Sequence, residues 1–325
     1  MTKSKTKNSN YLNFIYITVL ILLIIAVVIL PQVAIQTVFQ GILLWATKVL
    51  PALLPFFVLT KLLSYTTFAS NSSKFLSPIT NKLYNVGGVA GYIFFMSIIS
   101  GYPVGAKITA DLYQNNQITS GQARTIAAFT STSGPLFIIG TVGVGFFQST
   151  QFGFIVLISH IIAAIINGLF YRNKEKSTTA NFTTQPPTQN ILNDSMYSSI
   201  ISITMVGGFI AISYMILSLI SYLNIFSLPI RILSSLGINE SLSNSVMSGL
   251  IEVTTGLNLL SKTKTNFKLS AIISSFLISF GGFSIHAQAY CYLKTFQLKY
   301  KDFLKQKTTH AIISALVTFV ILLIL

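Results

Sequence analysis

The stretch ISGYPVGAK, residues Ile99–Lys107, decides how this chain folds. It lies within an otherwise apolar run, yet it contains two glycines and a proline, which weaken or break an α-helix. Inside a membrane every backbone N–H and C=O group needs a partner, so a break is tolerated only within protein or beside a water-filled cavity. Two interpretations are open: a kink that helps helices to pack, or a break that exposes backbone groups to a solute.

The composition is that of a membrane protein. Of the 325 residues, 52% are hydrophobic and 8% are charged, whereas soluble domains carry about 25% charged residues. Several apolar runs approach or exceed the ~20 residues that cross a bilayer. We therefore expect an all-α, polytopic transmembrane bundle. The runs are Tyr11–Leu30, Ala34–Leu63, Val86–Pro103, Ile126–Phe147, Phe152–Tyr171, Ser198–Leu223, Ile225–Leu236, Leu242–Leu260, Leu269–Tyr290 and Ala311–Leu325.

The formal net charge of +15 comes from short basic stretches between the apolar runs. Such stretches mark cytoplasmic loops under the positive-inside rule. They are Lys3–Lys7, Arg172–Lys176, Lys262–Lys268 and Lys294–Lys307. No soluble basic domain offers a surface for a nucleic-acid duplex. We expect the lipid bilayer as the partner, no nucleic acid, and a place in the cell membrane with the N-terminus and residues 172–194 in the cytoplasm.

The apolar runs divide the chain into four parts. Residues 1–33 form an N-terminal anchor helix, because their apolar run is longer than the ~7–15 residues of a signal peptide. Residues 34–171 form a first membrane half and residues 195–325 a second. Between them, residues 172–194 are polar, contain prolines and lack periodicity, which predicts a linker.

The two halves repeat at a shift of 181 positions. This shift places GYPVGAKITADL (Gly101–Leu112) on GFSIHAQAYCYL (Gly282–Leu293). Interrupted apolar segments at corresponding places in two halves indicate a transporter site. Lysines flank Leu269–Tyr290 on both sides, which predicts a re-entrant hairpin folded at Gly281–Gly282. Whether the repeats are inverted stays open.

A second interruption is TSTSGPLFIIGTVGVG, Thr130–Gly145. Pro135 after Gly134 is typical of a helix start. A helix that begins within the membrane points its N–H groups at whatever lies there, and Thr132 and Ser133 add hydroxyl groups. The alternative is an ordinary helix start at the membrane edge.

Ionisable residues inside apolar runs indicate function because burying a charge is costly. Lys48 and Glu252 are two of these, and we expect a buried ion pair between the halves. The alternative has Lys48 reaching the interface and Glu252 near a helix end. His286 follows the second-half glycines, where it could bond a ligand or be a satisfied buried histidine.

Signatures of enzymes are absent from the sequence. It contains no HExxH, no GxxxxGK[ST] and no Cys/His spacing for a metal. Cys291 is the single cysteine, which rules out an intramolecular disulfide. We expect no catalysis, no cofactor and no metal.

Four motifs in order resemble one family. LPALLPFF (Leu50–Phe57), SGYPVGAK (Ser100–Lys107), SGPLFIIGTVGVG (Ser133–Gly145) and GLIEVTTG (Gly249–Gly256) are similar to the YlbJ-type sporulation integral membrane proteins. These carry the Gate, or nucleoside-recognition, domain. The resemblance implies two Gate-like halves with broken or re-entrant helices, similar in plan to nucleoside transporters.

The resemblance also implies which residues line a central site. They are Pro55, Gly101, Pro103, Gly105, Ser133, Gly134, Pro135, Glu252 and Gly256, to which the motifs above add Thr132, Gly282 and His286. We expect the protein to transport or sense a small polar solute, nucleoside-like by family. The alternative is a non-transporting assembly factor for the spore cortex or cell envelope, which would bind an envelope partner. Association into a homo-oligomer is compatible with either.

Overall fold

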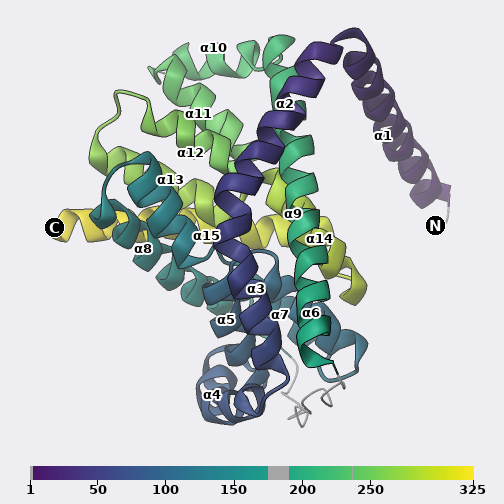
Figure 1. Ribbon diagram of the computed structural model, residues 1–325, viewed down its shortest axis with the longest axis vertical. Coiled ribbons are helices and arrows are strands. Elements are labelled where there is room, and N and C mark those ends of the chain that lie inside the picture. Colours follow the sequence, from purple (N-terminus) through teal and green to yellow (C-terminus); the bar gives the residue numbers. More distant parts are fainter. Residues whose placement is uncertain (1–2, 175–189, 236) are drawn as a thin grey trace.

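The computed structural model describes residues 3–174, 190–235 and 237–325, and the regular structure in these ranges is entirely helical (Figure 1). The α-helices are α1 (Lys3–Ile29), α2 (Pro31–Leu44), α3 (Leu50–Ser64), α4 (Phe68–Tyr84), α5 (Val89–Ser100), α6 (Val104–Gln114), α7 (Ser120–Thr130), α8 (Thr150–Phe170), α9 (Ile191–Tyr222), α10 (Ser227–Ser235), α11 (Glu240–Ile251), α12 (Val253–Ser261), α13 (Phe267–Phe280), α14 (Gly282–Leu293) and α15 (Tyr300–Ile324). Two π-helical segments, η1 (Trp45–Val49) and η2 (Leu136–Phe146), and a 3₁₀ turn, η3 (Lys294–Phe296), complete them.

Four segments are long and apolar enough to cross a membrane: α8, α9, α15 and the combined stretch Phe267–Phe296. Two bent pairs raise the number to six if each is one span. Large apolar side chains remain exposed on these helices, Ile212 and Leu323 among them. A hydrocarbon environment explains such exposure, because lipid is as apolar as the side chains. The predicted all-α membrane protein with broken helices is confirmed.

Helix α1, the expected N-terminal anchor, does not continue straight into α2. Helix α1 ends at Ile29, and Pro31 begins α2, as expected for a residue that has no N–H to donate. Tyr16–Ile29 and Pro31–Val49 enclose an angle of 101°. In Figure 1, α1 therefore projects away from the other helices.

The expected re-entrant hairpin at Gly281–Gly282 is wrong. Helices α13 and α14 together form one candidate span, interrupted but not folded back at these glycines. The prediction took Lys268 as the mark of a cytoplasmic loop. In the structure, its Nζ donates to the carbonyl of Leu322, 2.8 Å away. A lysine near a helix C-terminus interacts with the negative end of the helix dipole. Here it does so for α15.

The predicted linker, residues 172–194, ends earlier than expected. Helix α8 stops at Phe170, and α9 already begins at Ile191. Residues 175–189 lie outside the described residues. The predicted boundary between the two halves, between α8 and α9, stays a prediction.

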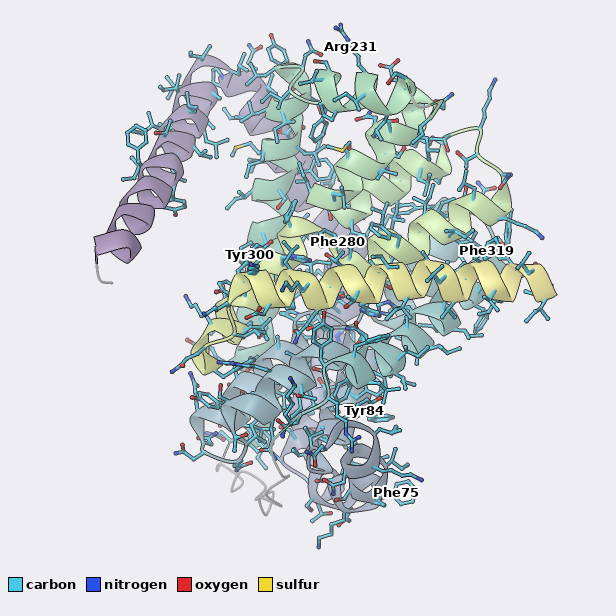
Figure 2. All side chains as sticks on the ribbon, turned by 180° about the vertical axis from the view of Figure 1, so that it is seen from behind. Phe75, Tyr84, Arg231, Phe280, Tyr300 and Phe319 are labelled. Carbon is cyan, nitrogen blue, oxygen red and sulfur yellow. The ribbon has the colours of Figure 1, made fainter. Side chains whose placement is uncertain are left out.

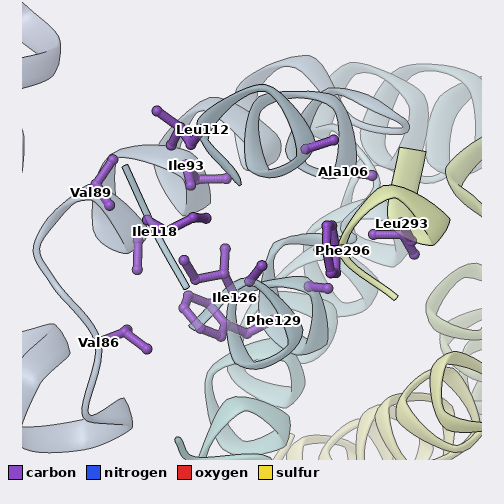
Figure 3. Close-up of a cluster of buried hydrophobic side chains, with 14 of the residues drawn as sticks. Val86, Val89, Ile93, Ala106, Leu112, Ile118, Ile126, Phe129, Leu293 and Phe296 are labelled. Atoms are coloured by element: carbon purple, nitrogen blue, oxygen red, sulfur yellow. The ribbon is translucent and has the colours of Figure 1, made fainter. Parts of the chain in front are cut away.

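The two halves pack into each other. Helices α2 and α3 lie along α9, while α15 crosses behind and packs on α8 and α13 (Figures 1 and 2). One core gathers side chains of the first half, including Ile93, Ile126 and Phe129, around Leu293 and Phe296 of the second half (Figure 3). This shared core holds α5, α6 and α7 in place and thereby positions the breaks between them.

Candidate functional site

The first break separates α5 from α6. Gly101 adopts φ +74°, a conformation that glycine reaches without strain, and its N–H still bonds to the carbonyl of Ser97 at 2.8 Å. The Tyr102–Pro103 peptide bond is cis. Pro103 then caps the start of α6. The sequence prediction of a helix break at this glycine and proline is confirmed.

The second break separates α7 from η2 and touches the first. Helix α7 ends at Thr130, and Pro135 caps the start of η2 as predicted. If Gly101 were an alanine, its Cβ would lie only 2.9 Å from the amide nitrogen of Gly134, which is closer than van der Waals contact. Gly105 likewise lies against the carbonyl of Thr130. The two breaks therefore meet backbone to backbone, and only glycines permit that distance.

Hydroxyl groups fill the space around this meeting point. Thr132 is buried, and its Oγ1 lies 2.8 Å from Oγ of Ser97. The Ser97 hydroxyl also donates to the carbonyl of Thr130, which the end of α7 leaves free. Ser100 and Ser131 are buried, and their hydroxyls have no hydrogen-bond partner among the described residues.

Two further breaks belong to the second half. Gly281 and Gly282, with φ of +92° and +69°, separate α13 from α14. Glu252 separates α11 from α12, which pack together as a hairpin. A methyl group on Gly282 would lie 3.0 Å from the carbonyl oxygen of Gly249 and 3.1 Å from that of Ile251. The hairpin tip thus rests on the α13–α14 break.

Tyr102 connects the halves. Its hydroxyl lies 3.6 Å from where a methyl group on Gly281 would be. The four breaks therefore form one continuous buried region, which runs from Gly134 through Gly101 and Gly281 to Glu252. The equivalence of Gly101 and Gly282 under the 181-residue shift agrees with this, since both stand at breaks with positive φ.

His160, on α8, holds two breaks together. Its Nε2 accepts from the N–H of Ser133 at 2.9 Å, so its Nδ1 carries the proton and donates to Oγ of Ser279 at 2.7 Å. One neutral imidazole thereby bonds both the second break and the last turn of α13. Its ring also lies 4.8 Å from that of His310, centroid to centroid.

The other two histidines also have hydrogen-bond partners. His286 Nε2 donates to the carbonyl of Phe280 at 2.8 Å, and its Nδ1 lies 3.2 Å from the hydroxyl of Tyr300. His310 Nε2 donates to the carbonyl of His160 at 3.2 Å. Of the two alternatives for His286, the structure favours the buried, satisfied histidine, which bonds a carbonyl that the α13–α14 break leaves free.

Lys307, on α15, is buried at the centre of this region. Its Nζ donates to the hydroxyl of Tyr102 and, at 2.9 Å, to the carbonyl of Ser131; Nδ1 of His310 is 3.5 Å away. Sequence reasoning missed this residue by grouping it with the basic loop before α15. The signal was available, because Phe303, Lys307 and His310 recur at the spacing of one helix face, and that face is buried.

A cavity of about 110 Å³ begins beside the first break. Helices α3 and α6 of the first half and α9 of the second supply most of its lining, with hydroxyl and charged groups that include Thr60, Lys61, Lys107, Asp111 and Ser202. The Lys107 ammonium donates to Oγ of Ser198 at 2.8 Å and of Ser202 at 2.9 Å.

The charges of this cavity influence each other. Burial lowers the pKa of Lys107, and the nearby Asp111 opposes part of that change. Burial raises the pKa of Asp111, which Lys107 opposes in turn. The cavity thus carries charges of both signs on a lining that is otherwise mostly apolar, and α6, which bears both charges, is not itself a candidate span.

Three expected site residues take other places. Lys48 is exposed on η1, whereas Glu252 is buried and caps α12, so the two do not form the expected ion pair. Pro55 is exposed on α3 and does not line the buried region. Gly256 packs against Gly249 and closes the α11–α12 hairpin.

Comparison with known proteins agrees with this architecture. Residues 46–150 match the Gate family, described as nucleoside recognition. The chain is 32% identical to the "Sporulation integral membrane protein YlbJ" of Bacillus subtilis (strain 168), over 90% of this chain and 78% of that protein. No solved structure matches. The chain belongs to the YlbJ family of sporulation integral membrane proteins, which carry a Gate domain.

Proposed function

We propose that this protein carries a small polar solute across the membrane, with the joined breaks and the adjacent cavity as its binding region. The observation that carries the proposal is the position of the cavity. It begins at Val104, the first residue of α6 after the break, and is lined by both halves. Binding regions between two repeats, at discontinuous helices, are characteristic of secondary transporters.

The chemistry of the cavity supports a solute that makes hydrogen bonds and carries charge. Lysines, an aspartate and hydroxyl groups line it. Its volume of about 110 Å³ is below the ~300–1,000 Å³ of pockets for drug-sized ligands. A nucleoside, which the description of the Gate family suggests, would therefore require the cavity to widen.

The test is thermal unfolding of the full-length protein in lipid nanodiscs with a panel of nucleosides, nucleobases, inorganic phosphate, small carboxylates and cations. A ligand that binds the native state at a concentration of 100 Kd stabilises it by about 2.7 kcal/mol. We expect a saturable increase in Tm for one solute. Lys107→Met, in the cavity, should abolish it, whereas Lys74→Met, on the exposed surface of α4, should retain it.

Uptake of that solute into proteoliposomes then separates transport from sensing. Binding without uptake would support a sensor. The name of the Bacillus subtilis relative supports a second candidate, an assembly factor for the spore cortex or cell envelope. A silent panel, together with recovery of a defined envelope protein or of a second copy of the chain, would favour that role over transport.

We also infer that the N-terminus and residues 172–194 face the cytoplasm of a cell-membrane protein. The basic residues Arg172 and Lys174 after α8 support this orientation.

A further inference from the structure

Lys307 is a buried ionisable side chain that the proposed solute site does not include. Its side chain is 2% exposed, in the middle of the region where the breaks meet. Burying an ammonium is costly unless hydrogen bonds and opposite charge or dipoles compensate for the lost water. The groups around it therefore reveal what the site is built to hold.

Three acceptors surround the ammonium. They are the hydroxyl of Tyr102, the carbonyl oxygen of Ser131 and Nδ1 of His310. An ammonium has three N–H donors and no acceptor; two of these groups lie at close hydrogen-bond distance, and Nδ1 of His310 is 3.5 Å away. The tautomers agree as well, because Nε2 of His310 donates to the His160 carbonyl and leaves Nδ1 as an acceptor.

None of these partners carries a negative charge, so a cation at this point depends on dipoles for its stabilisation. Ser131 is the C-cap of α7, and its carbonyl lies at the negative end of that helix's dipole. This dipole favours a positive ion at this point.

We propose that Lys307 is a built-in cation, whose ammonium occupies a monovalent-cation site formed by the first two breaks. Discontinuous transporter helices coordinate a free cation through unwound carbonyls and the C-terminal ends of half-helices. Here the carbonyl of Ser131, at the C-terminal end of α7, bonds to Nζ of Lys307 instead of to a free cation. An ammonium group resembles a potassium ion in charge and size. The protein therefore needs no free sodium or potassium ion at this point, and the charge ties α15 to the breaks.

If the lysine side chain were removed, the space would keep the carbonyl of Ser131, the hydroxyl of Tyr102 and the imidazole of His310. A free cation of suitable size should then enter it.

The experiment measures the Tm of the full-length protein in lipid nanodiscs without any solute, in choline, sodium, potassium or methylammonium chloride at equal ionic strength. The variants are Lys307→Ala, purified in methylammonium chloride, and Lys307→Met, which keeps the volume without the charge. Lys305→Ala is the matched control, since Lys305 is exposed on the same helix.

We expect the wild type and Lys305→Ala to unfold at the same temperature in all four salts. Lys307→Ala should lose about 5–10 °C in choline and regain at least half of that loss in potassium or methylammonium. Lys307→Met should lose stability in every salt, because its side chain blocks entry of an ion.

The proposal is overturned if Lys307→Met is as stable as the wild type, since the charge would then be unnecessary. It is also overturned if no cation restores Lys307→Ala, or if sodium or potassium stabilises the wild type more than Lys307→Ala. None of these outcomes depends on a transported solute. Failure here and failure of the proposed transport function are therefore distinguishable.

Discussion

At the scale of single residues, two glycines decide how closely the breaks approach. Gly101 combines positive φ with direct contact to Gly134, so that both the backbone conformation and the available space exclude a side chain. Sequence reasoning identified Gly101 from its local pattern alone. The backbone that lies against it comes from a segment about thirty residues further along the chain.

Gly101→Ala should lower the free energy of unfolding by about 1–3 kcal/mol, because alanine is strained at this φ and its methyl group would meet the amide of Gly134. The matched control is Gly208→Ala on α9, where nothing lies within 4 Å of the added methyl group. Thermal unfolding of both variants is the measurement. Equal Tm values would contradict the assigned packing of the two breaks.

A second prediction at this scale concerns His160. His160→Phe keeps a ring but leaves the N–H of Ser133 and the hydroxyl of Ser279 without their partner. Each buried unsatisfied group costs about 1–3 kcal/mol, so we expect a loss of about 2–6 kcal/mol. Ser279→Ala leaves only the imidazole N–H unpaired and should cost less. Denaturant unfolding gives both values, and the reverse order would disprove the bridging role.

At the scale of elements, the α11–α12 hairpin depends on Glu252 as a helix cap. Its carboxylate accepts from the N–H groups of Thr254 at 3.0 Å and Thr255 at 2.6 Å, and from the Thr255 hydroxyl at 2.7 Å. A carboxylate at a helix N-terminus satisfies free donors and interacts with the positive end of the dipole. Glu252 therefore fulfils its bonding within its own hairpin.

A double-mutant cycle tests this assignment. Glu252→Ala should cost about 1–3 kcal/mol, and Lys48→Met less than about 0.5 kcal/mol, because Lys48 is exposed. The two effects should add, with a coupling energy below about 0.5 kcal/mol. A coupling of more than about 1 kcal/mol would restore the ion pair that the sequence suggested.

At the scale of the whole molecule, the course of α13 and α14 sets which loops share a side of the membrane. The pair forms one candidate span from Phe267 to Phe296. The exposed residues Lys264 and Lys299 flank its two ends. Lys264 and Lys299 should therefore lie on opposite sides of the membrane. The positive-inside rule, applied to every basic loop, would instead place both in the cytoplasm.

Single cysteines test this topology. In a Cys291→Ser background, which removes the only native cysteine, Lys264→Cys and Lys299→Cys should react with a membrane-impermeant thiol reagent from opposite sides of oriented vesicles. Lys262→Cys should behave as Lys264→Cys does, as an internal control. Labelling of both positions from one side would instead indicate a re-entrant segment.

The sequence by itself determined the class of the protein and the places where its helices stop. Composition and apolar run length predict an all-α membrane protein, because only helices or closed barrels satisfy the backbone in lipid. Glycine interrupts a helix because, without a Cβ, it reaches positive φ without strain. Proline interrupts it because its φ is fixed and it has no N–H to donate. The breaks at Gly101–Pro103 and before Pro135 could therefore be predicted locally.

Only the tertiary structure decided what the breaks enclose. Lys307 bonds to Tyr102 across 205 positions, and His160 joins Ser133 to Ser279. No local pattern encodes such partners, because a charge before an apolar helix has the same sequence context whether it faces water or turns inward. The energy of burying it is set by neighbours that the fold brings from both halves of the chain.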